Sequence, residues 1–267
     1  MDFQLAALCG LTFIIHYIGT LAYAVRIAGV RTRRIAISFA LFNVLVLLSR
    51  TSNTFQGPFL AKRIEASLKS GVSAHLLSDF RYLLLSATIA TIAGAISVPT
   101  FQRLFSRAVS HFQTNRSMSK LILHGFAKGG LSYVKLVATL PSAAHLKAIK
   151  PWREVSPSVI VLNIVAQALI TVAVFAALYA GSLNPAFRVT SSMLSSVING
   201  LATVALFVFI DPYLSVMTDD VVEGRTSEAS FRRAVVCLAG TRIAGTLLAQ
   251  IIFVPAALLI ALVASHL

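Results

Sequence analysis

The chain has 267 residues, of which 57% are hydrophobic and only 12% are charged, and its mean hydropathy is +0.83. Soluble proteins carry about 25% charged residues, so this composition excludes an ordinary soluble domain. The net charge of +14 would suggest nucleic acid in a soluble protein. In a membrane protein it fits topology signals, anionic headgroups or a phosphorylated lipid, and we expect no nucleic-acid partner.

The apolar residues fall in runs of about 20, which is the length needed to cross about 30 Å of hydrocarbon, and they do not alternate as barrel strands do. We therefore predict an all-α, polytopic integral membrane helix bundle, forming one membrane domain over residues 1–267. Six spans are predicted, near residues 3–25, 35–54, 81–105, 157–181, 192–215 and 237–264. Cys9 and Cys237 lie in or beside these spans without metal-ligand spacing, so we interpret them as buried thiols.

The second span is the least typical, because its apolar stretch ends at Leu48 and a polar run follows. This run contains Arg50, Asn53 and Gln56. Polar side chains at that depth require the protein interior or a wet cavity. A charge near hydrocarbon costs about 2.5–3.5 kcal/mol on insertion scales, so Arg50 is either an anion-binding residue or a snorkelling arginine at a helix end.

Two further segments are predicted between spans. Gly57-Pro58 is typical of a helix start, and an apolar residue recurs every four positions after it, which predicts an amphipathic helix over 58–70 that lies on the membrane surface. The basic connection 106–153 is mostly apolar from 121 onwards, with scattered cations and a Gly-Gly pair, which predicts broken or re-entrant helices there.

The basic residues predict the orientation of the chain. The connections at 26–34, 103–153 and 225–242 hold seventeen of the twenty-three Lys and Arg residues and lie on one side if there are six spans. The positive-inside rule places that side in the cytoplasm and both termini outside. Two three-helix halves would then be inverted relative to each other, a common plan of transporters.

Several polar residues within or beside the spans are candidates for a role. Arg26 and Arg33 lie in a basic cluster after the first span, where they either report topology or capture a lipid phosphate. Arg242 and Asp211 are predicted to form an ion pair, either structural or coupled to transport. The polar residues His16, Asn43 and Asn163 are interpreted as hydrogen-bonding contacts between helices, with His16 also a candidate proton carrier and Asn43 a candidate substrate contact.

An enzymatic alternative rests on one acidic group. Asp219, Asp220 and Glu223 could hold magnesium against a diphosphate, or they could simply form an acidic helix terminus. Prenyl-transferring membrane enzymes usually carry two such groups, and this chain has one. The sequence also lacks a Gly-rich phosphate loop and a nucleophile elbow, so we expect no cofactor, no metal site and no catalytic residue.

The first 65 residues resemble a known family. The resemblance is carried by Phe-Ile-Ile-His-Tyr-Ile-Gly-Thr-Leu-Ala-Tyr-Ala-Val-Arg-Ile-Ala-Gly-Val-Arg-Thr at 13–32, Ser-Phe-Ala-Leu-Phe-Asn at 38–43 and Leu-Ser-Arg-Thr-Ser-Asn-Thr-Phe-Gln-Gly-Pro at 48–58. These stretches are similar to Amj, the alternate-to-MurJ lipid II flippase family. The remainder of the chain agrees with the family in length and hydropathy.

The resemblance implies translocation of lipid II, the undecaprenyl-diphosphate-linked disaccharide-pentapeptide, across the bacterial cytoplasmic (inner) membrane for peptidoglycan synthesis. On this reading the chain is a transporter whose partners are lipid II, membrane lipids and cell-wall synthesis proteins. Arg50 would anchor the diphosphate, Asn53 and Gln56 would contact sugar or phosphate, and Arg26 and Arg33 would capture the headgroup on the cytoplasmic side. The competing readings are an enzyme acting on polyprenyl phosphates and a non-transporting scaffold for cell-envelope enzymes.

Overall fold

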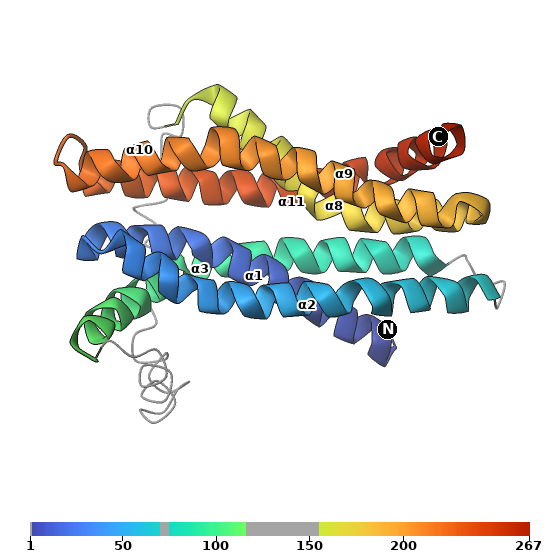
Figure 1. The fold of residues 1–267 in the computed structure, drawn as a ribbon, viewed down its shortest axis with the longest axis horizontal. Coiled ribbons are helices and arrows are strands. Elements are labelled where there is room, and N and C mark those ends of the chain that lie inside the picture. The colour runs from blue at the N-terminus through green and yellow to red at the C-terminus, as the bar shows by residue number, and fades with distance from the viewer. Residues whose placement is uncertain (1, 70–74, 116–154) are drawn as a thin grey trace.

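The computed structural model describes residues 2–69, 75–115 and 155–267 (Figure 1). These residues are almost entirely helical and contain no strand. Six helical segments are long and apolar enough to cross a membrane. The prediction of an all-α membrane bundle with six spans is therefore confirmed in the described part of the chain.

The chain divides into two halves of three spans each. The N-terminal half consists of α1 (Phe3–Thr32), α2 (Ile35–Lys69) and α3 (Leu76–Asn115). The C-terminal half consists of α8 (Pro157–Leu183), the 3-10 turn η2 (Pro185–Phe187), α9 (Arg188–Ala205), the π-helical segment η3 (Leu206–Ile210), α10 (Asp211–Val222) and α11 (Glu228–His266). The segments from η2 to α10 form one continuous span over 185–222.

The two halves form two layers with the same internal packing order (Figure 1). In each half the first helix packs extensively against both of the others: α1 contacts α2 and α3, and α8 contacts α9 and α11. The halves meet mainly through α3 and α11. The N- and C-termini lie toward the same end of the bundle, as an even number of spans requires.

Side-chain caps fix where the helices begin. An Asp2 carboxylate oxygen accepts a hydrogen bond from the Leu5 backbone N–H at 2.8 Å, which caps α1. Ser156 caps α8, whose first residue is Pro157, a position where proline removes no helical hydrogen bond. At the other end of α1, Arg33 adopts a left-handed conformation (φ 53°) and turns the chain into α2.

The segment after Gly57 differs from its prediction. Pro58 lies inside α2, which continues unbroken to Lys69 instead of giving way to a separate surface helix. The apolar side chains of Leu60 and Ile64 are fully buried in a core cluster that also includes Leu5 of α1. The burial of these side chains holds the segment in line with the rest of α2. With 35 residues, α2 is about 50 Å long and exceeds the thickness of the hydrocarbon layer.

The predicted connection 106–153 is only partly described. Residues 106–115 are the last turns of α3, so the third span extends beyond its predicted end at residue 105. The rest of that connection, including the expected re-entrant helices, lies outside the described residues.

Candidate functional site

A buried cationic centre lies between the two halves. It is formed where Arg242 of α11 approaches Gly19 of α1: a Cβ built on Gly19 would lie 2.5 Å from Nη2 of Arg242 and 3.4 Å from Cζ. Arg242 is half-buried as a residue, but its Nε is shut off from solvent and has no hydrogen-bond partner in the described part of the chain. The glycine therefore provides the space in which the guanidinium lies.

Polar groups from three helices surround this centre. The Asn163 Nδ2 of α8 donates to Thr241 Oγ1 at 2.7 Å and approaches the Leu238 carbonyl oxygen at 3.4 Å. The Tyr23 hydroxyl of α1 donates to the same carbonyl at 3.2 Å. One turn before Gly19, His16 is only 8% exposed. The arrangement brings together side chains that are separated by more than 200 residues in the chain.

Three of these polar atoms have unused hydrogen-bonding capacity. Within the described residues, His16 Nδ1, Asn163 Oδ1 and Arg242 Nε are buried and unpartnered. Buried polar groups are nearly always paired, and an unpaired one costs about 1–3 kcal/mol. A cluster that leaves an acceptor, a cationic donor and an imidazole unpartnered has the chemistry of a site that binds a polar, anionic group.

The carboxylates of the described residues do not pair with Arg242. Seven of the eight Asp and Glu residues in the described ranges are ion-paired with other arginines, and the eighth, Asp219, is exposed on α10. Arg242 forms no ion pair with any described residue. A buried charge costs several kcal/mol unless it is paired, and no carboxylate of the described residues pairs with Arg242.

The centre lies near the middle of the bundle's length. Gly19 is 13 residues before the end of α1 at Thr32, which is about 20 Å along the helix. Arg242 is 14 residues into α11, again about 20 Å. Transporters with two inverted halves commonly place the substrate site at this depth, between the halves.

One end of the bundle is tied across the halves by a different ion pair from the one predicted. Arg26 Nη2 of α1 lies 2.6 Å from Asp211 Oδ1 of α10, and Arg26 also stacks over Phe39, with Cζ 5.2 Å from the ring centroid. The predicted pair of Asp211 with Arg242 is therefore wrong. Arg242 lies beside Gly19, seven residues and about 10 Å along α1 from Arg26, and is too deep in the bundle to reach the carboxylate.

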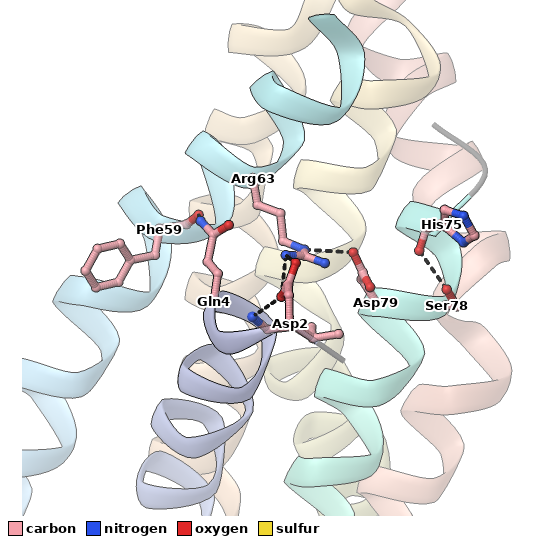
Figure 2. Close-up of polar contacts among 8 residues, drawn as sticks. Asp2, Gln4, Phe59, Arg63, His75, Ser78 and Asp79 are labelled. Atoms are coloured by element: carbon pink, nitrogen blue, oxygen red, sulfur yellow. Dashed lines mark hydrogen bonds and ion pairs between the residues drawn. The ribbon is translucent and has the colours of Figure 1, made fainter. Parts of the chain in front are cut away.

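The opposite end holds a three-residue ion cluster (Figure 2). Arg63 of α2 donates to both carboxylate oxygens of Asp2, at 2.9 and 2.7 Å, and its Nε donates to Asp79 Oδ2 of α3 at 2.7 Å. The Asp2 carboxylate also caps α1. The cluster therefore joins three helix ends within the N-terminal half.

A second pair at this end crosses between the halves. Arg188 Nη2, at the start of α9, lies 3.0 Å from Glu65 Oε1 near the end of α2. Because Arg188 follows the end of α8 and Glu65 neighbours the cluster at the start of α1, α8 ends where α1 begins. The two halves thus run in opposite directions, and within the described ranges one ion pair joins them at each end.

Most of the site residues predicted in α2 lie away from the centre. Arg50, Asn53 and Asn43 are exposed, and the Arg50 guanidinium forms no ion pair with a described carboxylate. The structure thus does not place Arg50 in a recess. Gln56 is buried, and its Nε2 donates to Thr12 of α1, so it ties two helices together.

The other predicted residues are also placed. Arg33 is exposed and forms the turn between α1 and α2. Of the acidic group, Asp220 and Glu223 pair with Arg225 beside the turn into α11. In the described ranges, no three His, Cys, Asp or Glu side chains are grouped so that they could hold a metal ion.

Two residues that define the centre's geometry were not predicted from the sequence. Gly19 and Tyr23 carry no charge and belong to no motif, so nothing local singles them out. The one available signal was spacing: His16, Gly19 and Tyr23 recur at intervals of three and four residues and therefore share one face of a helix. That face points at the long cationic side chain of α11.

Together these features define a polytopic helical membrane protein of two antiparallel halves that enclose a cationic, hydrogen-bonding centre. The sequence profile of the Amj family (Alternate to MurJ) matches residues 11–264, and the chain belongs to this family. It is 39% identical over 249 residues to "Lipid II flippase Amj" of Bacillus subtilis (strain 168), which covers 93% of this chain and 92% of that protein. The resemblance seen in the first 65 residues is thereby confirmed. No solved structure matches the chain.

Proposed function

We propose that this protein translocates lipid II across the cytoplasmic membrane, by alternating access to the centre at Arg242. The substrate class follows from the family and from the name of the Bacillus subtilis relative, a lipid II flippase. The chain is accordingly a transporter and not an enzyme. The observation that carries the mechanism is the half-buried arginine at mid-depth, whose Nε is shut off from solvent and which no described carboxylate pairs with.

The chemistry of the substrate fits this centre. Lipid II carries a diphosphate and a large polar headgroup, and leaving either in hydrocarbon is prohibitive. Guanidinium forms short, charge-assisted hydrogen bonds to phosphate oxygens, often two at once. Around Arg242, the unpartnered Asn163 Oδ1 and His16 Nδ1 would receive or share hydrogen bonds with headgroup hydroxyls and phosphate. The prenyl chain would stay in the bilayer beside the protein.

The two cross-half ion pairs would act as gates. Arg26–Asp211 closes one end of the contact between the halves and Arg188–Glu65 closes the other. Breaking one pair while the other holds would open the centre to one side of the membrane at a time. This is alternating access by rocking of two inverted halves.

The basic residues support an orientation. Arg31, Arg33 and Arg34 are exposed at the end of the bundle opposite the termini, which the positive-inside rule assigns to the cytoplasm. Both termini then lie outside. Arg33 would capture the headgroup at the cytoplasmic mouth, whereas Arg26, held by Asp211, would serve the gate. We extend the proposal to transient contact with cell-wall synthesis proteins, which make and consume this substrate.

The diphosphate could instead be anchored by exposed residues of α2, above all Arg50. An experiment can distinguish this placement from anchoring at Arg242. Cells depleted of their main lipid II flippase would be supplied with the wild-type chain, Arg242→Gln or Arg50→Ala, each matched for membrane expression. Growth and externally accessible lipid II would be scored. We expect the wild type and Arg50→Ala to rescue and Arg242→Gln to fail.

Failure of the wild-type chain would overturn the function itself. Rescue by Arg242→Gln together with failure of Arg50→Ala would instead move the anchor to the polar run of α2. If both arginine variants rescue growth and only changes of surface residues abolish it, the result would favour a non-transporting scaffold.

A further inference from the structure

A second arginine lies in an open groove between the two halves. The groove has a volume of about 550 Å³ and lies where α3 and α11 meet, toward the end of the bundle that holds the termini. Its lining residues are Leu77, Ser78, Arg81, Tyr82, Leu85 and Gln250. It therefore combines one cation, an amide and two hydroxyls with apolar walls.

The guanidinium of Arg81 is held in place by neutral groups. Arg81 Nη1 donates to the Gln250 backbone carbonyl and lies 3.2 Å from Gln250 Oε1, while Gln250 Nε2 donates back to the Arg81 carbonyl at 3.2 Å. Its Cζ lies 5.6 Å from the ring centroid of Phe253. No carboxylate of the described residues pairs with Arg81. Guanidinium has five N–H donors, so donors remain for an anion.

The outer wall of the groove is apolar and exposed. Tyr82 and Leu85 are 50% and 47% exposed, and Leu77 is 38% exposed. On a bundle of this hydropathy such side chains face lipid. A ligand that matches the groove therefore has an anionic end beside Arg81 and a hydrocarbon chain along Tyr82 and Leu85.

The groove is close to the central site without being part of it. Gln250 follows Arg242 by eight residues, which is about 12 Å along α11. The contact between α3 and α11 is also the main one between the halves. A lipid phosphate at Arg81 would thus lie next to the surface that must open during alternating access.

We infer that this groove binds the diphosphate end of a polyprenyl lipid as a lateral docking site, on the membrane side where the termini lie. The choice of a polyprenyl lipid over a bulk phospholipid rests on the proposed function. A diphosphate can engage the free guanidinium donors through two oxygens and still leave the chain in the bilayer. In the flippase cycle this is the position where the lipid enters or leaves the opening between the halves.

Photo-crosslinking in nanodiscs tests the inference. Purified full-length protein in phosphatidylcholine nanodiscs would be labelled with a trace of a diazirine-bearing polyprenyl diphosphate and mapped by mass spectrometry. We expect labels within 77–85 and near Gln250. Loss of charge-assisted hydrogen bonds worth about 1.4 kcal/mol would lower labelling about ten-fold in Arg81→Gln. The matched control is Arg103→Gln, an exposed arginine at the other end of α3, which should label as the wild type does.

A second variant keeps the inference testable if Arg81→Gln does not fold. Leu85→Trp fills the groove from its exposed wall and leaves Arg81 and Gln250 untouched, so it should also lower labelling while the protein stays monodisperse. Unchanged labelling in both variants would overturn the inference. Competition by excess phosphatidylglycerol as effective as competition by unlabelled polyprenyl diphosphate would overturn the ligand class. If the wild-type protein is labelled in the groove but moves no lipid II in vesicles, the proposed transport function would be contradicted, whereas lipid binding in the groove would still be supported.

Discussion

The guanidinium of Arg242 occupies the space that a side chain at position 19 would need, since a Cβ on Gly19 would lie 2.5 Å from Nη2. The obstructing atom is the far end of a flexible side chain, so a methyl group there would displace the guanidinium and leave the backbone in place. Helix α1 thus positions the cation by omitting a side chain. A substitution at position 19 can therefore displace the guanidinium while Arg242 itself is kept.

Gly19→Ala should therefore impair transport while the protein still folds. Alanine favours a helix interior over glycine by about 0.5–1 kcal/mol, which partly offsets the cost of moving Arg242. Lipid II translocation in reconstituted vesicles should fall, with a thermal midpoint close to that of the wild type. Gly10→Ala is the matched control, because a Cβ at Gly10 meets nothing within 4 Å. Equal activity of both variants would contradict positioning by Gly19.

Removing the charge of Arg242 should abolish lipid II translocation without lowering the thermal stability of the protein. Arg242→Met keeps an unbranched, flexible side chain and removes a half-buried cation whose Nε is buried without a partner among the described residues. Replacing buried ionic groups by apolar ones is often neutral or stabilising by about 1–4 kcal/mol. We expect the variant to unfold at the same or a higher temperature in detergent, and to translocate no lipid II. A large loss of thermal stability would show that Arg242 holds the fold together.

The fold class was predictable because a membrane span can be recognised from the hydropathy of consecutive residues alone. Apolar runs of membrane length allow few other structures, and the six spans follow from them. The continuity of α2 was not predictable in the same way. Gly57-Pro58 is typical of a helix start, and only the burial of Leu60 and Ile64 against α1 explains why the helix continues.

The site was predictable only in part, because its contacts join distant parts of the chain. Arg242 stands out in sequence as a charge within an apolar span, yet its surroundings come from α1 and α8. Asp211 and Arg26 are 185 residues apart, so no local pattern connects them. Arg50 also stood out as a charge in a span, but its exposure depends on which face of α2 packs against α1.

The two proposed gates, Arg26–Asp211 and Arg188–Glu65, should differ in how strongly they respond when the acid is neutralised. Asp211→Asn leaves Arg26, whose side chain is 13% exposed, without its acid, whereas Glu65→Gln breaks a pair whose partners are 39% and 48% exposed. Exposed pairs contribute about 0–1 kcal/mol, and breaking a more buried pair costs more. The native cysteines report each end: Cys237 is near the Arg26 gate and Cys9 is nearer the Glu65 gate.

Alkylation rates of the two thiols measure gate opening. Asp211→Asn should speed labelling of Cys237, about ten-fold if opening becomes easier by about 1.4 kcal/mol. Glu65→Gln should speed labelling of Cys9 by a smaller factor. Single-cysteine backgrounds assign the signal, and the conservative swap Asp211→Glu should restore the slow rate. Equal acceleration at both thiols in Asp211→Asn would indicate general loosening of the bundle and contradict a local gate.

The first turn of α1 should loosen at acidic pH. Hydrogen bonds from Arg63 and then from the Leu5 backbone hold the pKa of the Asp2 carboxyl below its ordinary value of 3.8. A carboxyl whose pKa is lowered on folding stabilises the folded protein above its ordinary pKa, and this contribution is lost as the pH falls through the lowered value. Hydrogen exchange of residues 3–8 should therefore be constant from pH 7 to about 5, after correction for intrinsic rates, and should accelerate below the ordinary pKa. Asp2→Asn should give fast exchange at every pH, because the amide loses the ion pair with Arg63. The same acid-dependent acceleration in Asp2→Asn would contradict the assignment of this pH dependence to Asp2.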